Sequence, residues 1–163
     1  CTQWMHVLHL NDESGKMSKS KGEFLTVSLL EEKGYNPVVY RFFCLQSHYR
    51  KTLTFSFDAL DNATQAYEKL IAKIAQLDLT ANDGVDNEEA DRLIQKFDQA
   101  MCIDLNTANG LSVIYDVLKS NANDATKLYV LGQLDSVLSL DLLDAAKTLA
   151  NSPILLTTYS SDP

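Results

Sequence analysis

An apolar stripe with helical spacing runs through residues 57–77 and constrains the fold of this chain more than any other feature. Its residues are mostly three or four positions apart, which matches the 3.6-residue period of an α-helix and not the alternation of a strand. A helix with one apolar face must bury that face against other elements. The members of the stripe are Phe57, Leu60, Ala63, Tyr67, Leu70, Ile71, Ile74 and Leu77.

Three further segments have the same spacing and extend the helical pattern. They predict helices over residues 87–101, 106–119 and 124–138, the first of them with Asn87 as its N-cap. The sequence shows no further periodic element from the break at residues 151–153 onward. Four amphipathic helices joined by short or medium loops are typical of an antiparallel bundle. The fold class is therefore expected to be mainly α.

The part of the chain before this bundle predicts shorter elements. Residues 4–10 alternate loosely between aromatic and aliphatic side chains and could form a short strand. Residues 26–33 and 37–45 predict two helices, and the second is apolar on most sides, so we expect it to be buried. Residues 53–57 are interpreted as an extended connector into the bundle.

We divide the chain into residues 1–55 and 56–163, and the charge follows a similar division. The net charge is −8, yet residues 1–51 carry 7 Lys/Arg against 5 Asp/Glu, whereas residues 52–163 carry 7 against 17. Phosphate neutralisation needs clustered cations, so the acidic part cannot bind nucleic acid through broad electrostatics. Any contact with a polyanion is expected in the first third of the chain.

The cysteine pattern and the apolar runs exclude two further classes. Cys1, Cys44 and Cys102 are an odd number without a C-x-x-C pair, which argues against a disulfide framework and a zinc knot, and for a reducing, cytoplasmic compartment. We expect Cys44, Cys102 and Trp4 to be core residues. No apolar run of about 18 residues is present, so we expect no membrane span.

A basic loop lies between Gly15 and Gly22. Its residues are Lys16, Met17, Ser18, Lys19 and Ser20, with Lys21 directly after them. Such a run is often a solvated surface loop, but amines and hydroxyls on a mobile loop also suit phosphate oxygens. A lysine that reaches those oxygens only in the transition state lowers the barrier of a phosphate-transfer step. His6 and His9, nearby, are interpreted as residues at the end of a strand.

The five letters KMSKS of this loop are also the ATP-site signature of class I aminoacyl-tRNA synthetases. The succession of motifs around them resembles cysteinyl-tRNA synthetases in particular, and a later stretch, Asp104 to Leu111, resembles the D-x-N-T-x-x-A-L stretch of that family. The resemblance covers about residues 4–120. It rests on Trp4-Met5-His6, Gly15 to Gly22, Phe24 to Val27, Gly34-Tyr35-Asn36-Pro37, Arg41-Phe42 and His48-Tyr49-Arg50, in this order.

The resemblance implies activation of cysteine with ATP and its transfer to tRNA(Cys). Lys19 would contact ATP and stabilise the transition state with support from Lys16, and Met17 would anchor the loop, so that residues 16–20 form the ATP site. Residues 24–55 would correspond to the connector that approaches the inner side of the tRNA. Its exit residues Arg50 and Lys51 are the candidate nucleic-acid contacts.

The resemblance also implies the architecture of the protein and its other components. The segment up to residue 55 would be the end of a Rossmann-type catalytic domain, and the helices would form a DALR-type tRNA-binding domain. Zinc would be bound by ligands upstream of this chain, so no metal ligand is assigned within it. We expect a monomer, and we expect this chain by itself to be inactive.

Two other functions remain open at this stage. One is a related ligase that joins cysteine to an amino sugar, as in mycothiol formation, because it shares the loop and the fold. The other is a non-catalytic helical interaction module in which the motif is coincidental. Binding of tRNA through exposed Arg50 and Lys51 would separate the first alternative from a tRNA ligase.

Overall fold

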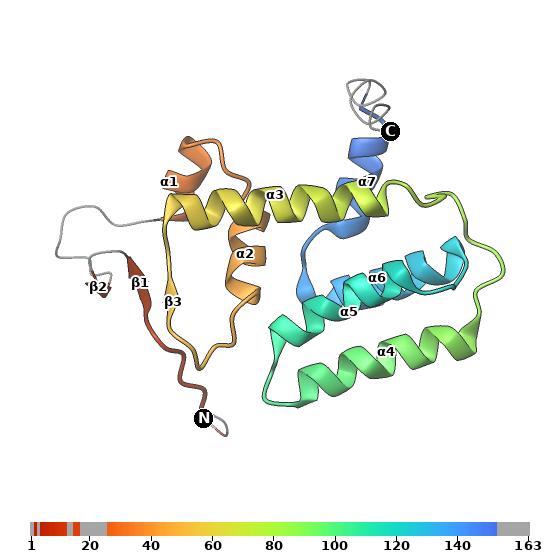
Figure 1. Ribbon diagram of the computed structural model, residues 1–163, viewed down its shortest axis with the longest axis horizontal. Helices are drawn as coiled ribbons and strands as arrows, with labels where there is room; N and C mark the ends of the chain where they lie inside the picture. The colour runs from red at the N-terminus through yellow and green to blue at the C-terminus, as the bar shows by residue number, and fades with distance from the viewer. Residues whose placement is uncertain (1, 3, 13–14, 17–25, 153–163) are drawn as a thin grey trace, which may run out of the picture.

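The structure is a computed structural model that describes residues 2, 4–12, 15–16 and 26–152 (Figure 1). It confirms a mainly helical fold, with seven helices and three short strands in these ranges. None of these helices combines the length and the apolar character needed to cross a bilayer. In chain order the elements are β1 (Leu10–Asp12), β2 (Gly15–Lys16), α1 (Val27–Glu32), α2 (Pro37–Leu45), β3 (Leu53–Thr54), α3 (Phe57–Ile74), α4 (Asn87–Cys102), α5 (Thr107–Lys119), α6 (Asp124–Leu138) and α7 (Leu142–Ala150).

The three strands form a small sheet in the order β2-β1-β3. β1 pairs antiparallel with β2 and parallel with β3, where Leu10 lies opposite Leu53. The expected strand over residues 4–10 is wrong for most of its length, because strand structure begins only at Leu10. Trp4, which we expected in the core, is 80% exposed. Before β1, Leu8 N donates a hydrogen bond of 3.1 Å to the Tyr49 carbonyl oxygen.

The first two helices begin where their capping residues predict. The Thr26 hydroxyl accepts a hydrogen bond of 3.1 Å from Leu29 N, and the Asn36 side chain accepts one of 2.9 Å from Val38 N. Gly34 has a φ of +86°, which suits the residue after a helix because glycine has no Cβ to clash. Three residues of α2 are buried, as expected: Val39, Phe42 and Phe43.

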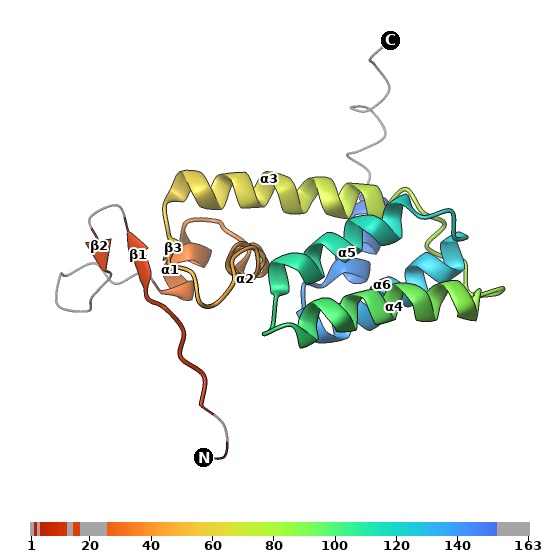
Figure 2. The ribbon, with the colours of Figure 1, turned by 60° about the horizontal axis from the view of Figure 1, so that its bottom comes forward.

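The long helix α3 packs mainly against α2 and α7, whereas α4, α5 and α6 pack against one another (Figure 2). The sequence predicted one bundle of four helices that included α3. The structure instead has a three-helix group next to α3, and both belong to one continuous cluster of buried apolar residues. The Ser56 hydroxyl caps α3 by accepting from Ala59 N at 3.1 Å.

The helix α7 was not predicted from the sequence, and the residue at its N-cap position does not cap it in the structure. Asp141 precedes the helix, has a φ of +57° and makes no side-chain cap. The carboxylate of Asp135, at the end of α6, takes that role by accepting from Leu140 N at 2.7 Å and Leu142 N at 2.9 Å. A cap from another helix leaves no local pattern in the sequence, so the element is recognised only in the structure.

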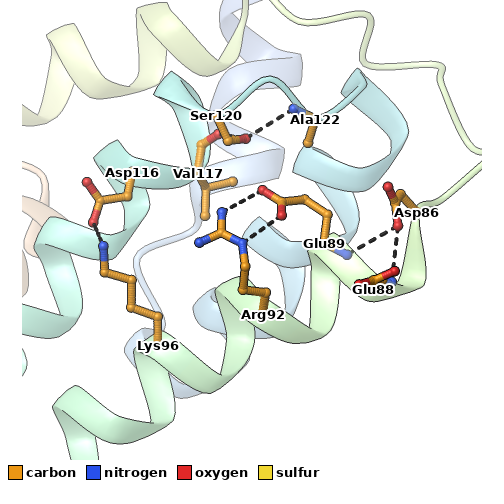
Figure 3. Close-up of polar contacts among 9 residues, drawn as sticks. All are labelled: Asp86, Glu88, Glu89, Arg92, Lys96, Asp116, Val117, Ser120 and Ala122. Atoms are coloured by element: carbon orange, nitrogen blue, oxygen red, sulfur yellow. Dashed lines mark hydrogen bonds and ion pairs between the residues drawn. The ribbon is translucent and has the colours of Figure 1, made fainter.

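Figure 3 shows the polar surface of α4 and α5. The N-cap of α4 is Asp86 and not Asn87, because the Asp86 carboxylate accepts from the N–H groups of Glu88 and Glu89, at 3.1 and 3.2 Å. Lys96 of α4 pairs with Asp116 of α5 at 2.8 Å. Cys102, expected in the core, is exposed at the end of α4, and Cys44 is only half-buried.

Candidate functional site

The basic loop begins at the end of β2. The backbone of Lys16 lies in this strand opposite Asn11 of β1. Met17, Ser18, Lys19 and Ser20 lie outside the described residues. What the structure describes is therefore the base of the loop, which is held by a strand that pairs on its other side with β3. The backbone N–H of Phe55, just after β3, donates to the Asn11 carbonyl at 2.7 Å and extends this pairing.

The predicted nucleic-acid contact Arg50 belongs to a cluster that joins two distant parts of the chain. We call His48, Tyr49, Arg50 and Asp104 the Asp104 cluster. Arg50 Nε lies 2.6 Å from Asp104 Oδ2, and its Nη2 donates to Asp104 Oδ1 at 3.1 Å. The Tyr49 hydroxyl donates to the same Oδ1 at 2.5 Å. One carboxylate therefore binds two consecutive side chains of the α2 exit.

His48 completes the cluster through the backbone of the same turn. Its Nε2 donates to the Asp104 carbonyl oxygen at 2.8 Å, while its Nδ1 accepts from Arg50 N at 3.2 Å. The imidazole also stacks on the Tyr49 ring, with 4.7 Å between the ring centroids. The exit from α2 is thus ordered by side-chain contacts and not by regular secondary structure.

The turn between α4 and α5 places the Asp104 carboxylate in the cluster. Asp104 and Leu105 have φ values of 55° and 51°, in the left-handed region. Asp is tolerated there, but a residue such as Leu pays about 1–2 kcal/mol. Asn106 then caps α5 by accepting from Asn109 N at 3.1 Å. The Thr107 hydroxyl donates to the Leu45 carbonyl at 2.8 Å, a second bond between this turn and the end of α2.

The contacts within the cluster stabilise its charges. Hydrogen bonds from Arg50 and then Tyr49 lower the pKa of Asp104, and the same carboxylate raises the pKa of Arg50 and of Tyr49. The Arg50 side chain is 66% exposed and that of Asp104 is 45% exposed. Both groups are therefore charged and in contact with solvent at neutral pH.

Lys51 follows the cluster and differs from Arg50 in its environment. It is exposed, and its side chain makes no hydrogen bond or ion pair within the part of the chain that the structure describes. The structure thus places the two predicted nucleic-acid contacts next to each other, one held by a carboxylate and one free of such contacts. Sequence reasoning missed the partner of Arg50, since Asp104 is 54 residues away and no local pattern links the two.

An apolar hollow of about 320 Å³ lies beside the cluster. It is bounded by the segment before β1, by α2 and by Leu105 of the strained turn. Burial raises the pKa of Tyr40 to about 12 and also raises the pKa of the Cys44 thiol. Both groups stay protonated at neutral pH, so neither is a nucleophile or a base there.

A search of the described ranges for metal ligands gives no group of three or more His, Cys, Asp or Glu side chains that could hold an ion. His6 and His9, like the rest of their segment, are exposed. The donor groups of the predicted sites are the amines and hydroxyls of residues 16–20 and the cations of Arg50 and Lys51. Both sets suit phosphate oxygens.

Comparisons with known proteins match two family models in succession. The model of the tRNA synthetases class I (C) catalytic domain matches residues 1–65, and the DALR domain model matches residues 96–151. The second match covers α5, α6 and α7 together with the strained turn before them. These two matches follow the order of the motifs along the sequence.

Individual relatives agree with the family models. The cysteine–tRNA ligase of Novosphingobium aromaticivorans is 43% identical over 145 residues, which cover 86% of this chain and 29% of the relative. That of Borreliella burgdorferi is 34% identical over 173 residues, with 96% of this chain and 35% of the relative covered. Cysteine–tRNA ligase 1 of Burkholderia lata is 37% identical over 142 residues, with 85% and 28% covered.

The chain spans about a third of the length of the curated relatives it matches. Similarity over nearly the whole of this chain excludes a coincidental occurrence of the five-residue motif. The ordered family matches, the relatives and the helical architecture lead to one conclusion: the chain belongs to the cysteinyl-tRNA synthetase family, of which it carries part of the class I catalytic domain followed by the DALR domain.

Proposed function

We propose that the protein carrying this chain activates cysteine with ATP and transfers it to tRNA(Cys). The observation that carries the proposal is the succession of a class I catalytic match and a DALR match around the intact Lys16–Ser20 motif. The relatives named above are cysteine–tRNA ligases, which supports the same reaction. The division of the chain at residue 55 stays a prediction.

In this proposal the basic loop acts on the triphosphate of ATP. When the cysteine carboxylate attacks the α-phosphate, negative charge builds up on the phosphoryl oxygens and on the leaving pyrophosphate. Lys19 stabilises that charge with support from Lys16, and the hydroxyls of Ser18 and Ser20 add hydrogen-bond donors. Met17 anchors the loop. The pairing of β2 with β1 supports this role, because it fixes the point from which the loop departs.

Arg50 and Lys51 contact the phosphate backbone of the tRNA in the same proposal. Their exposure and their position in the cationic third of the chain support this role. The contact must be local, since residues 52–163 carry a large excess of carboxylates. A monomer and a cytoplasmic location remain proposals. So does zinc, for which the described residues offer no ligand set.

The test is cysteine-dependent ATP–pyrophosphate exchange by the full-length protein and its Lys19→Ala variant. We expect the substitution to lower the exchange rate about 100- to 1,000-fold, as the loss of one transition-state donor does. Lys119→Ala, at an exposed position of α5, is the matched control and should leave the rate unchanged. Absence of exchange in the wild type would refute the function, and near-normal exchange in Lys19→Ala would remove Lys19 from its role.

The second step, in which activated cysteine is transferred to an acceptor, distinguishes the tRNA ligase from the amino-sugar ligase. A protein that activates cysteine and then charges tRNA(Cys) supports the proposal. A protein that activates cysteine, fails to bind tRNA at low salt and transfers the cysteinyl group to an amino sugar refutes the second half of it.

A further inference from the structure

The Asp104 cluster combines an unfavourable backbone with contacts that contribute little to stability. Two consecutive non-glycine residues, Asp104 and Leu105, adopt left-handed φ values. The ion pair that this turn makes is exposed, with 66% and 45% of the two side chains accessible. Exposed ion pairs contribute little to folding, because water screens them and ordering long side chains costs entropy. The contribution of this ion pair to folding stability therefore does not by itself explain why the turn keeps its strained backbone.

Local strain of this kind is common at binding sites, where the surrounding structure holds a residue in place for function. Here the strained turn brings a carboxylate to one edge of the Arg50 guanidinium. Asp104 contacts Nε and Nη2, and Tyr49 contacts Nε from the same side at 3.0 Å. The ring of Tyr49 also lies under the guanidinium carbon, 5.2 Å from the ring centroid. The side chain of Arg50 is thus fixed at two points although most of it is exposed.

The other edge of the guanidinium remains available. Nη1 makes no hydrogen bond or ion pair with any residue in the described part of the chain. Arginine has five N–H donors in a fixed plane, so fixing one edge also fixes the direction of the other. A planar, pre-oriented donor pair is well suited to phosphate oxygens, and Lys51 adds a second cation next to it.

We propose that Asp104 is a positioning residue, which holds Arg50 in the orientation that binds a phosphate of the RNA backbone. This inference rests on the proposed function, since it assigns a role in tRNA binding. A fixed guanidinium loses less conformational entropy on binding than a free one, so the carboxylate favours RNA binding despite its negative charge. Asp104 acts through Arg50 and does not itself touch the RNA.

Positioning by Asp104 and simple charge repulsion predict opposite effects of the same substitution on tRNA binding. If Asp104 only repelled phosphates, Asp104→Asn would strengthen tRNA binding and steepen its salt dependence. If Asp104 positions Arg50, the same variant weakens binding and makes the salt dependence shallower. Asparagine tolerates left-handed φ values as aspartate does, so this substitution keeps the turn.

The experiment measures four quantities on the full-length protein: cysteine-dependent exchange, KM for tRNA(Cys), kcat for tRNA(Cys), and the salt dependence of tRNA binding. For Asp104→Asn we expect unchanged exchange and an unchanged kcat, with KM raised about tenfold, the equivalent of one charge-assisted hydrogen bond. The slope of binding against salt should fall by up to about one unit, as for the loss of one phosphate contact.

Two further variants show whether the effect passes through Arg50. In an Arg50→Gln background, Asp104→Asn should change neither KM nor the salt slope, because the group it positions is already gone. Asp116→Asn is the matched control, since Asp116 also pairs with a cation at 2.8 Å and its side chain is 41% exposed. This control should behave as the wild type.

The possible results separate this inference from the proposed function. Lack of cysteine-dependent exchange in the wild type refutes the proposed function. Normal wild-type exchange with an unchanged or lowered KM in Asp104→Asn overturns the positioning role alone. If Asp104→Asn abolishes both cysteine-dependent exchange and tRNA charging, the role of Asp104 is purely structural. That result also overturns the positioning role.

Discussion

Arg41 Nε donates a hydrogen bond of 2.6 Å to the carbonyl oxygen of Leu138, which lies 97 residues later in the chain. The donor belongs to α2 and the acceptor is in the last turn of α6. The Tyr67 hydroxyl of α3 donates in the same region, to the Leu140 carbonyl at 2.7 Å. The corner between α6 and α7 is therefore held by α2 and α3, two helices outside the three-helix group.

Arg41→Met should lower the free energy of unfolding by about 1–3 kcal/mol, because it leaves a carbonyl at the helix end without its charged donor. Methionine keeps most of the aliphatic length, so the change tests the hydrogen bond more than the packing. Denaturant unfolding followed by circular dichroism measures the difference. Arg92→Met, at an exposed ion pair within α4, is the control and should change stability by no more than about 0.5 kcal/mol. Equal effects of the two variants would contradict the assigned role of Arg41.

Asp135→Ala should destabilise the protein by about 1–2 kcal/mol, because it removes the cap that α7 receives from α6. Two backbone N–H groups, those of Leu140 and Leu142, lose their acceptor. Amide hydrogen exchange should show the loss of protection first in α7. Asp144→Ala is the matched control, since that side chain is 78% exposed and pairs only with Lys147. Unchanged protection of α7 in Asp135→Ala would show that the helix is capped in another way.

Replacement by alanine should stabilise the protein at one helical glycine, Gly132, and not at another, Gly110. A Cβ at Gly132 would meet only Leu143 Cδ1 at 3.5 Å, so Gly132→Ala should stabilise α6 by about 0.5–1 kcal/mol. A Cβ at Gly110 would lie 3.0 Å from Met101 Sδ and 3.2 Å from a ring carbon of Phe97. That crowding cancels the gain in propensity, so Gly110→Ala should be less stable than Gly132→Ala. Thermal unfolding of the two variants gives the comparison, and a more stable Gly110→Ala would refute it.

The Asp104 cluster should loosen in acid. The folded-state pKa of Asp104 lies below its usual value of 3.8 because Arg50 and Tyr49 bind the carboxylate. A lowered pKa gives a contribution that is present above the unfolded-state value and is lost as the pH falls through the folded-state value. The contacts to Tyr49 and Arg50 should therefore persist at neutral pH and weaken only below about pH 4. An NMR titration of the Asp104 carboxyl carbon measures this, and a midpoint at or above the usual value would contradict it.

The sequence predicted the helices whose signals are local. Thr26, Asn36 and Ser56 cap their helices as expected, and the apolar stripe of α3 is buried. The prediction failed where the deciding contact comes from another element. α7 depends on Asp135 of the preceding helix, and the packing of α3 depends on partners that periodicity does not identify, because a stripe shows which face is buried and not what buries it.

The candidate site, too, was predicted only where its sequence signals are local. The basic loop and the Arg50-Lys51 pair were predicted as site residues from adjacent letters, and these assignments stay predictions. The partner of Arg50 was not predicted. Its position is set by two residues with left-handed backbone, Asp104 and Leu105. Neither is a glycine, the residue type that most often indicates such a turn. Trp4 and Cys102 were misplaced for a related reason, since hydrophobic character predicts burial only on average.

The parallel pairing of β1 with β3 has a mechanical consequence. Only two residues, Phe55 and Ser56, separate β3 from α3, and both are bonded to their surroundings, so the sheet and the helix have no flexible joint between them (Figure 1). α3 has 18 residues and is therefore a stiff rod of about 27 Å. A tilt of about 5° at β3, which pairs through β1 with the strand at the base of the basic loop, would therefore move the far end of this rod by about 2 Å.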